Sequence, residues 1–287
     1  MSGILSGLLS GPLESCRDWP KATEIFSRTF SDLYENANKI RTFLEIGVKG
    51  IPFAAEEVHK KDLITARKMY HYFKQSSEKG KKPRGYKKHT FENTVKKAQA
   101  AKQSLEAAGL IFAHSMLDTA LSGLCRAAAL NNPLEWKSFI ANKEIKLSDY
   151  LEGNCYDFVQ KAFEKMLATF DFRSIDEKSN ILFKICKPEK IDLGPAQFKF
   201  SKHKLKNFDR LRHDIVHPTS SEVFIKGVDE WVTFAYNTSM YFIDMVHVSK
   251  KLYVDEKQML SFIFSTGAMR RQSNKQMEPS GKAAGSF

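Results

Sequence analysis

The stretch RLRHDIVHP, residues 210–218, places groups suited to acid–base and phosphate chemistry within one short segment. Histidine has an ordinary pKa of about 6.5, so His213 and His217 can accept or donate a proton near neutrality. Arg212 stays charged and can stabilise a phosphate that gains negative charge in a transition state. Arg212 and His217 together suit cleavage of an RNA phosphodiester by the neighbouring 2′-hydroxyl, a route that needs no metal.

Regular helix geometry would separate these two side chains. Arg212 and His217 are five positions apart, which on an α-helix is about 500° of rotation and leaves them about 140° apart around the axis. A proline pushes the residue before it out of the α region. We therefore expect Pro218 to make His217 leave the helix, so that its ring can turn toward Arg212.

Two other interpretations of this segment remain open. His213 and His217 have the i, i+4 spacing of helical metal sites, for which Asp209, Asp214 or a distant residue would have to supply a third ligand. Alternatively, the segment is purely structural. His217 would then cap the last carbonyls of its helix, and Arg212 would pair with a carboxylate.

Positive charge is concentrated in two blocks of a chain whose net charge is +12. Residues 79–103 carry nine Lys or Arg against one Glu, and residues 199–212 carry six against one Asp. Such concentration favours a polyanion, because bound phosphates release condensed counterions; the alternative is solvated helix faces. The candidate RNA contacts are Lys202, Lys204, Lys206 and Arg210 in the second block and Lys81, Lys82, Arg84, Lys87 and Lys88 in the first.

The elements that must position these residues are predicted to be helices throughout. Apolar residues recur at helical spacing over about 20–47, 54–73, 91–130 and 228–254, and we expect GVKGIPF to separate the first two helices. Pro133 should end the third. In the last helix an apolar seam runs from Trp231 to Leu252 in steps of three and four, which suits packing on another helix within the domain or across a dimer.

Shorter patterns add two more helices. The stretch YDFVQKAFEKMLATF repeats apolar residues on one face, and Ser174 with Glu177 fits a capping box that opens another helix. The cysteines, Cys16, Cys125, Cys155 and Cys186, form no CxxC pair, so we interpret them as buried thiols of a cytoplasmic protein. The chain has no run of about 18 apolar residues, and we expect no membrane-spanning helix.

The segment LRHDIVHP resembles the signature of HEPN domains, a superfamily of small all-α domains. That signature is an arginine, a polar residue, three more residues and a histidine, with apolar residues just before the histidine. Arg212, His213 and His217 match it, with Ile215 and Val216 as the apolar pair. The earlier helix FAHSMLDTALSGLCRAAA is similar to the early HEPN helix that carries a short acidic residue among leucines, here Asp118.

The resemblance implies an all-α helical bundle of HEPN type with an N-terminal helical extension. It covers about residues 91–266, which leaves 1–90 as an extension of unknown role, and we expect 267–287 to be a disordered tail. Many HEPN proteins are metal-independent endoribonucleases of toxin–antitoxin or antiviral-defence systems that act as homodimers. Here Arg212 would bind the scissile phosphate and His217 would be the general base or acid.

The resemblance also implies lesser roles. His213 would orient the pair or contact the substrate, and Asp118 is a possible supporting acid. We expect neither a cofactor nor a metal.

A free ribonuclease would harm its host, so we expect an antitoxin, a regulatory partner or a sensing function in residues 1–90. Two alternatives are a non-catalytic module that binds RNA or a nucleotide, and a helical interaction protein that docks a partner on the seam from Trp231 to Leu252.

Overall fold

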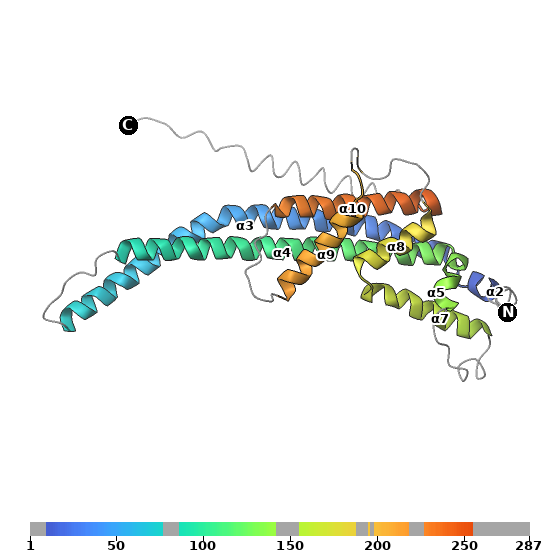
Figure 1. Cartoon of the computed structure of the whole chain (residues 1–287), viewed down its shortest axis with the longest axis horizontal. Helices are drawn as coiled ribbons and strands as arrows, with labels where there is room; N and C mark the ends of the chain where they lie inside the picture. The colour runs from blue at the N-terminus through green and yellow to red at the C-terminus, as the bar shows by residue number, and fades with distance from the viewer. Residues whose placement is uncertain are drawn as a thin grey trace, which may run out of the picture. The chain divides into compact units, whose positions relative to one another are not determined.

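The computed structural model describes residues 10–76, 86–141, 155–187, 195, 198–217 and 227–254 (Figure 1). Its elements are α2 (Ser10–Glu14), α3 (Trp19–Ser76), α4 (Tyr86–Asn131), η1 (Pro133–Trp136), α5 (Lys137–Ala141), α7 (Cys155–Thr169), η2 (Phe170–Phe172), α8 (Ile175–Cys186), α9 (Lys202–Val216) and α10 (Val228–Lys250). No strand occurs among the described residues. The all-α class is therefore confirmed for this part of the chain.

The chain divides into two compact units. Unit 1 draws its described residues from 1–33, 119–196 and 240–287, and unit 2 draws them from 34–118 and 197–239. Helices α3, α4 and α10 each contribute to both units. The domain boundary expected near residue 90 stays a prediction. The tail expected to be disordered, 267–287, lies outside the described residues.

In unit 2, α3 and α4 run antiparallel, side by side (Figure 1). Gly109 of α4 lies against Leu44 of α3. Further along α3, His59 Nδ1 lies 3.4 Å from Thr94 Oγ1 of α4. The sequence interpretation of a break at GVKGIPF is wrong, because α3 continues from Trp19 to Ser76 with Pro52 inside it.

The uninterrupted helix has a physical explanation at Gly47. A Cβ atom there would come within 2.5 Å of Leu105 Cδ2, so the glycine allows a leucine of α4 to approach the α3 backbone. A glycine inside a helix costs about 1 kcal/mol and a proline about 3 kcal/mol. Packing along the α3–α4 pair offsets these local costs, and local composition alone cannot reveal that packing.

Two glycines give a test of this packing. A Cβ added at Gly50 would have no heavy atom within 4 Å, whereas a Cβ added at Gly123 would lie 2.2 Å from Thr29 Oγ1. We expect Gly50→Ala to stabilise the protein by about 0.5–1 kcal/mol through helix propensity. We expect Gly123→Ala to destabilise it by about 1–3 kcal/mol through overpacking. Urea unfolding followed by circular dichroism measures both; shifts of the same sign would contradict the expectation.

In unit 1 the ends of the long helices are tied together. Asn131 ends α4 just before Pro133, as predicted, and the carbonyl of Asn131 accepts a hydrogen bond from Arg17 Nε at 3.0 Å. The side-chain amide of Asn131 in turn donates to the carbonyl of Lys250 at 2.9 Å. Helix carbonyls that would lack partners are thereby satisfied. The predicted capping box is confirmed, with Ser174 and Glu177 bonding reciprocally at the start of α8.

Helix α4 also contains a long apolar segment. By length and composition, Glu92–Asn131 includes one window that could cross a membrane, and 56% of that window is buried inside the protein. Buried core helices meet the same criterion. This feature therefore identifies no membrane segment by itself, and the expectation of no spanning helix stays a prediction.

The apolar seam of α10 is largely covered within the chain. Phe234, Thr238, Met245 and Leu252 are buried, whereas Val248 is exposed. Helix α10 ends at Lys250, four residues before the predicted end at 254. Packing within the chain therefore accounts for most of the seam.

Candidate active site

Helix α9 carries the predicted site residues and is anchored by one narrow face. Only Leu205 and Phe208 of its residues are buried. The Phe208 ring stacks nearly parallel on Trp231 of α10, with centroids 5.4 Å apart, and meets Phe234 edge-on at 6.0 Å. Ser201 caps the helix, since its hydroxyl accepts a hydrogen bond from the Lys204 amide. The helix is thus fixed at its start and middle, and its last turn carries the charged groups.

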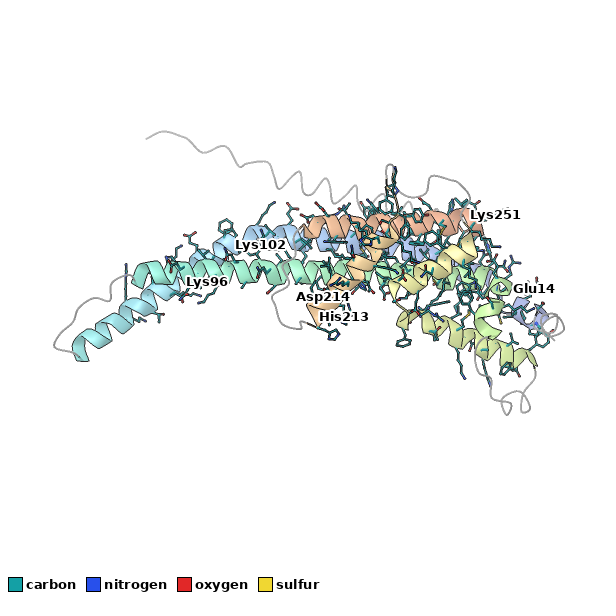
Figure 2. All side chains as sticks on the ribbon, in the orientation of Figure 1. Glu14, Lys96, Lys102, His213, Asp214 and Lys251 are labelled. Carbon is teal, nitrogen blue, oxygen red and sulfur yellow. The ribbon has the colours of Figure 1, made fainter. Side chains whose placement is uncertain are left out.

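His217 leaves α9 as predicted from the sequence, whereas the expected turn of its ring toward Arg212 stays a prediction. The helix stops at Val216, and His217 has φ −125° and ψ 67°, outside the helical region. Its backbone amide still donates to the carbonyl of His213 at 2.9 Å. The two imidazole rings lie close, with centroids 4.9 Å apart and planes inclined at 49°. Both histidines are exposed, and Figure 2 shows His213 at the tip of the helix.

Arg212 is half-buried on the same last turns. Asp209 lies three residues before Arg212 and four before His213, so all three share one side of α9. Arg212 and His213 both act electrostatically on the Asp209 carboxylate. No direct ion pair joins Asp209 to Arg212 among the described residues. Asp209 therefore does not occupy the N–H donors of the guanidinium.

The direct partner of Asp209 is His114 of α4. Nε2 of His114 lies 2.9 Å from Asp209 Oδ1, and the His114 side chain is only 11% exposed. The His114 ring also packs against Phe208, with centroids 5.4 Å apart. A nearly buried histidine of α4 thus lies beside the charged end of α9.

The hydrogen bond to His114 is the main cause that lowers the pKa of Asp209 below its ordinary value of 3.8. Partial burial opposes this shift, while the charges of His114, Arg212 and His213 reinforce it. Because the folded protein binds this proton more weakly than the unfolded chain, Asp209 stabilises the fold above pH 3.8. That contribution is lost as the pH falls through the lowered pKa.

The charge of Asp209 also determines which ring nitrogen of His114 carries a hydrogen. A charged carboxylate has no hydrogen to donate, so Nε2 of His114 must be the donor. The sequence interpretation overlooked His114 as a site residue and considered Asp209 only as a metal ligand. One signal was visible, since His114 and Asp118 are the only histidine and the only acidic residue in the apolar run from Leu110 to Cys125.

Asp118 lies one turn after His114 on α4 and is half-buried. Residues four apart share one side of a helix, so the two side chains project in a similar direction. Its predicted role as a supporting acid stays a prediction. The same holds for the metal alternative at His213 and His217, although the described residues contain no cluster of three His, Cys, Asp or Glu side chains suited to a metal ion.

The predicted RNA contacts fall into two groups. Lys202, Lys206 and Arg210 are exposed on α9, and Arg210 lies 3.8 Å from Asp214. The Lys204 ammonium lies over the rings of Trp231 and Phe234 at 5.4 Å and 5.0 Å, a cation–π arrangement that holds it on the protein. Of the first basic block, Lys81, Lys82 and Arg84 lie outside the described residues, as do the side chains of Lys87 and Lys88 in α4.

The cysteines offer no activated nucleophile among the described thiols. Cys125 and Cys186 are buried, and burial raises the pKa of both thiols. Cys16 is half-buried, and burial raises its pKa as well. A thiol rather than a thiolate is a weak nucleophile. The side chain of Cys155 lies outside the described residues.

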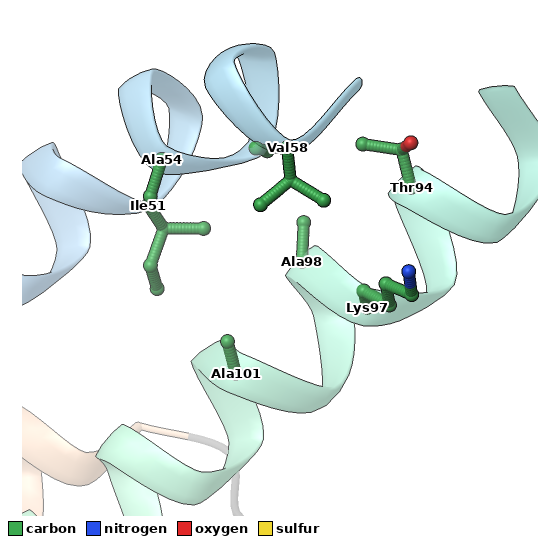
Figure 3. Close-up of a pocket in the computed structure, with 8 residues that line it drawn as sticks. Ile51, Ala54, Val58, Thr94, Lys97, Ala98 and Ala101 are labelled. Atoms are coloured by element: carbon green, nitrogen blue, oxygen red, sulfur yellow. The ribbon is translucent and has the colours of Figure 1, made fainter. Parts of the chain in front are cut away.

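A separate cavity of about 250 Å³ lies between α3 and α4 in unit 2 (Figure 3). Ile51 and Val58 of α3 face Ala98 and Ala101 of α4, so the walls are mostly aliphatic. Lys97 stands at its margin and also pairs with Asp62 at 3.3 Å. Such walls suit apolar contact, whereas the end of α9 carries the groups that can move protons and hold phosphate.

Comparison of the chain with protein-family models, curated proteins and solved structures gives no significant match. The end of α9 is the part of the described structure where titratable and cationic side chains suited to catalysis lie together.

Proposed function

We propose that this protein is a metal-independent endoribonuclease of HEPN type. The observation that carries the proposal is the gathering of Arg212, His213 and His217 at one helix end, with His217 outside the helix and both histidines exposed. An exposed imidazole beside a permanent cation fits an anionic substrate that must gain and lose protons. The exposed cations Lys202 and Lys206 on the same helix support RNA as that substrate.

In the proposed reaction Arg212 binds the scissile phosphate and stabilises its growing negative charge. The 2′-hydroxyl loses its proton and its oxygen attacks the phosphorus, while the bond from phosphorus to the 5′ oxygen breaks and that oxygen takes up a proton. His217 serves as the general base or the general acid, and His213 orients the pair or contacts the substrate. The products end in a 2′,3′-cyclic phosphate and a 5′-hydroxyl.

The same proposal includes the setting of the activity. We propose a cytoplasmic toxin or antiviral-defence effector that works as a homodimer, with two copies of the α9 end facing one cleft. An antitoxin or regulatory partner would restrain it, because an unrestricted ribonuclease degrades the RNA of its own host.

The direct test incubates purified protein with total RNA in EDTA. The variants are His217→Ala and Arg212→Ala, and the matched control is His203→Ala, which removes an exposed histidine from the first turn of the same helix. Loss of a general acid–base group or a phosphate-binding cation typically slows a reaction at least about 100-fold. We expect that loss in both site variants, wild-type rates in the control, and cyclic-phosphate ends on the products.

Equal cleavage by wild type and the site variants would point to a contaminating nuclease and remove the proposal. Absence of cleavage by the wild type, with or without phage infection of the expressing cells, would also remove it. Salt-sensitive RNA binding that survives His217→Ala without any cleavage would favour the non-catalytic binding module instead. That alternative has the exposed cations of α9 as its support.

A further inference from the structure

The contact between α4 and α9 places a fixed negative charge beside the proposed site. Asp209 accepts a hydrogen bond from His114 at 2.9 Å and lies on the same side of α9 as Arg212 and His213. His114 is nearly buried, and its ring rests against the fully buried Phe208. The carboxylate is thus held by a group that cannot itself move easily.

Asp209 and Arg212 form no direct ion pair among the described residues, although they share one side of α9. A bidentate pair would use the guanidinium N–H groups and leave few for a phosphate. The described structure instead has Asp209 hydrogen-bonded to His114, and the charge of Arg212 acts on the carboxylate without an ion pair. An arginine side chain has many rotamers, so a fixed charge nearby restricts them without occupying its donors.

We infer that Asp209, held in place by His114, is a positioning residue that orients Arg212 toward the scissile phosphate. This inference rests on the proposed function and adds two residues to its site. Neither residue touches the substrate, because each acts through the arginine. The geometry also gives His114 a specific task, which is to donate a hydrogen from Nε2 to Asp209 Oδ1.

The structure offers a matched pair of variants for Asp209. Asp209→Asn keeps the shape of the side chain and removes the charge. Asp214→Asn makes the same change five residues later on the same helix, at a side chain that is 44% exposed compared with 41% for Asp209. Asp214 is paired with Arg210 at 3.8 Å. The two variants therefore differ in which arginine loses its neighbouring carboxylate, and Asp209→Asn alone also changes the acceptor of the His114 hydrogen bond.

We expect Asp209→Asn to lower kcat about 10-fold or more at an unchanged KM, because misplacing a group that acts in the transition state affects the chemical step. Asp214→Asn should stay within about two-fold of wild type. Affinity for a 2′-deoxy substrate that cannot be cleaved should be the same in all three proteins. Thermal unfolding of each variant separates this effect from loss of folded protein.

His114 supplies the second arm of the experiment. His114→Gln keeps an N–H donor near the position of Nε2, whereas His114→Leu keeps bulk without a donor. We expect the glutamine variant to retain most of kcat and the leucine variant to lose it. Equal losses in both, in proportion to a fall in melting temperature, would mean that His114 serves the fold alone.

The outcomes separate the inference from its premise. If the wild type cleaves RNA, Arg212→Ala does not, and Asp209→Asn behaves like Asp214→Asn, the positioning role is overturned and the proposed function stands. If the wild type does not cleave RNA, the proposed function and the positioning role are both overturned.

Discussion

Replacing Phe208 with alanine is expected to lower the free energy of unfolding by about 3–5 kcal/mol, the usual cost of removing a buried phenylalanine. Phe208 is fully buried and contacts three rings, those of Trp231, Phe234 and His114. The surrounding rings come from α4 and α10 and are held by their own helices. They cannot easily collapse into the vacated space, so the loss should fall in the upper part of that range.

A matched control for Phe208 exists in the same chain. Phe172 of η2 is 88% exposed, so Phe172→Ala should change the free energy of unfolding by no more than about 0.5 kcal/mol. Urea titrations followed by circular dichroism measure both variants. If Phe208→Ala cost no more stability than Phe172→Ala, Phe208 could not be packed among the rings of α4 and α10 as described.

The Phe208 variant also bears on activity. Helix α9 buries only Leu205 and Phe208, so the Phe208 ring is one of the two buried side chains that hold the helix against the protein. Under the proposed function, Phe208→Ala should lower RNA cleavage at temperatures where the protein is still folded. Phe208→Leu, which keeps most of the apolar volume, should restore part of that loss.

Features set by local chemistry were predictable from sequence. The capping box of Ser174 and Glu177 needs only four consecutive residues, and α4 ends before Pro133 because proline cannot continue a helix. The exit of His217 from α9 follows in the same way from the proline after it. In each case the deciding interactions lie within one turn of the chain.

Features set by distant contacts were not predictable in this way. Gly47 and Pro52 suggest a break by local rules, yet α3 continues through both and packs along α4, where Leu105 approaches the glycine. His114 and Asp209 are 95 residues apart, and nothing in either segment shows that they meet. The residues proposed to do the chemistry were therefore visible in the sequence, whereas the pair proposed to position them was not.

The other large expected effect is a loss of stability when the buried ion pair in unit 1 is broken. The side chain of Lys250 is only 5% exposed, and its ammonium contacts Glu135 of η1 and the carbonyl of Ile185 at 3.2 Å. Removing one partner of a buried pair leaves an uncompensated charge, which typically costs about 3–5 kcal/mol. Glu135 is itself about a third exposed, so water can partly replace it. We therefore expect Glu135→Gln to cost about 2–3 kcal/mol.

Two further variants make this expectation specific. Glu56→Gln removes one partner of the exposed Lys60 on α3, which keeps Glu57, and should leave the free energy of unfolding close to that of wild type. The double variant Glu135→Gln/Lys250→Met removes the buried charge as well, and it should recover most of the stability lost in the single variant. Urea unfolding of the two single variants and the double variant tests this expectation. If Glu135→Gln cost as little as Glu56→Gln, the Lys250 ammonium would have another means of compensation, and burial of its charge would not depend on η1.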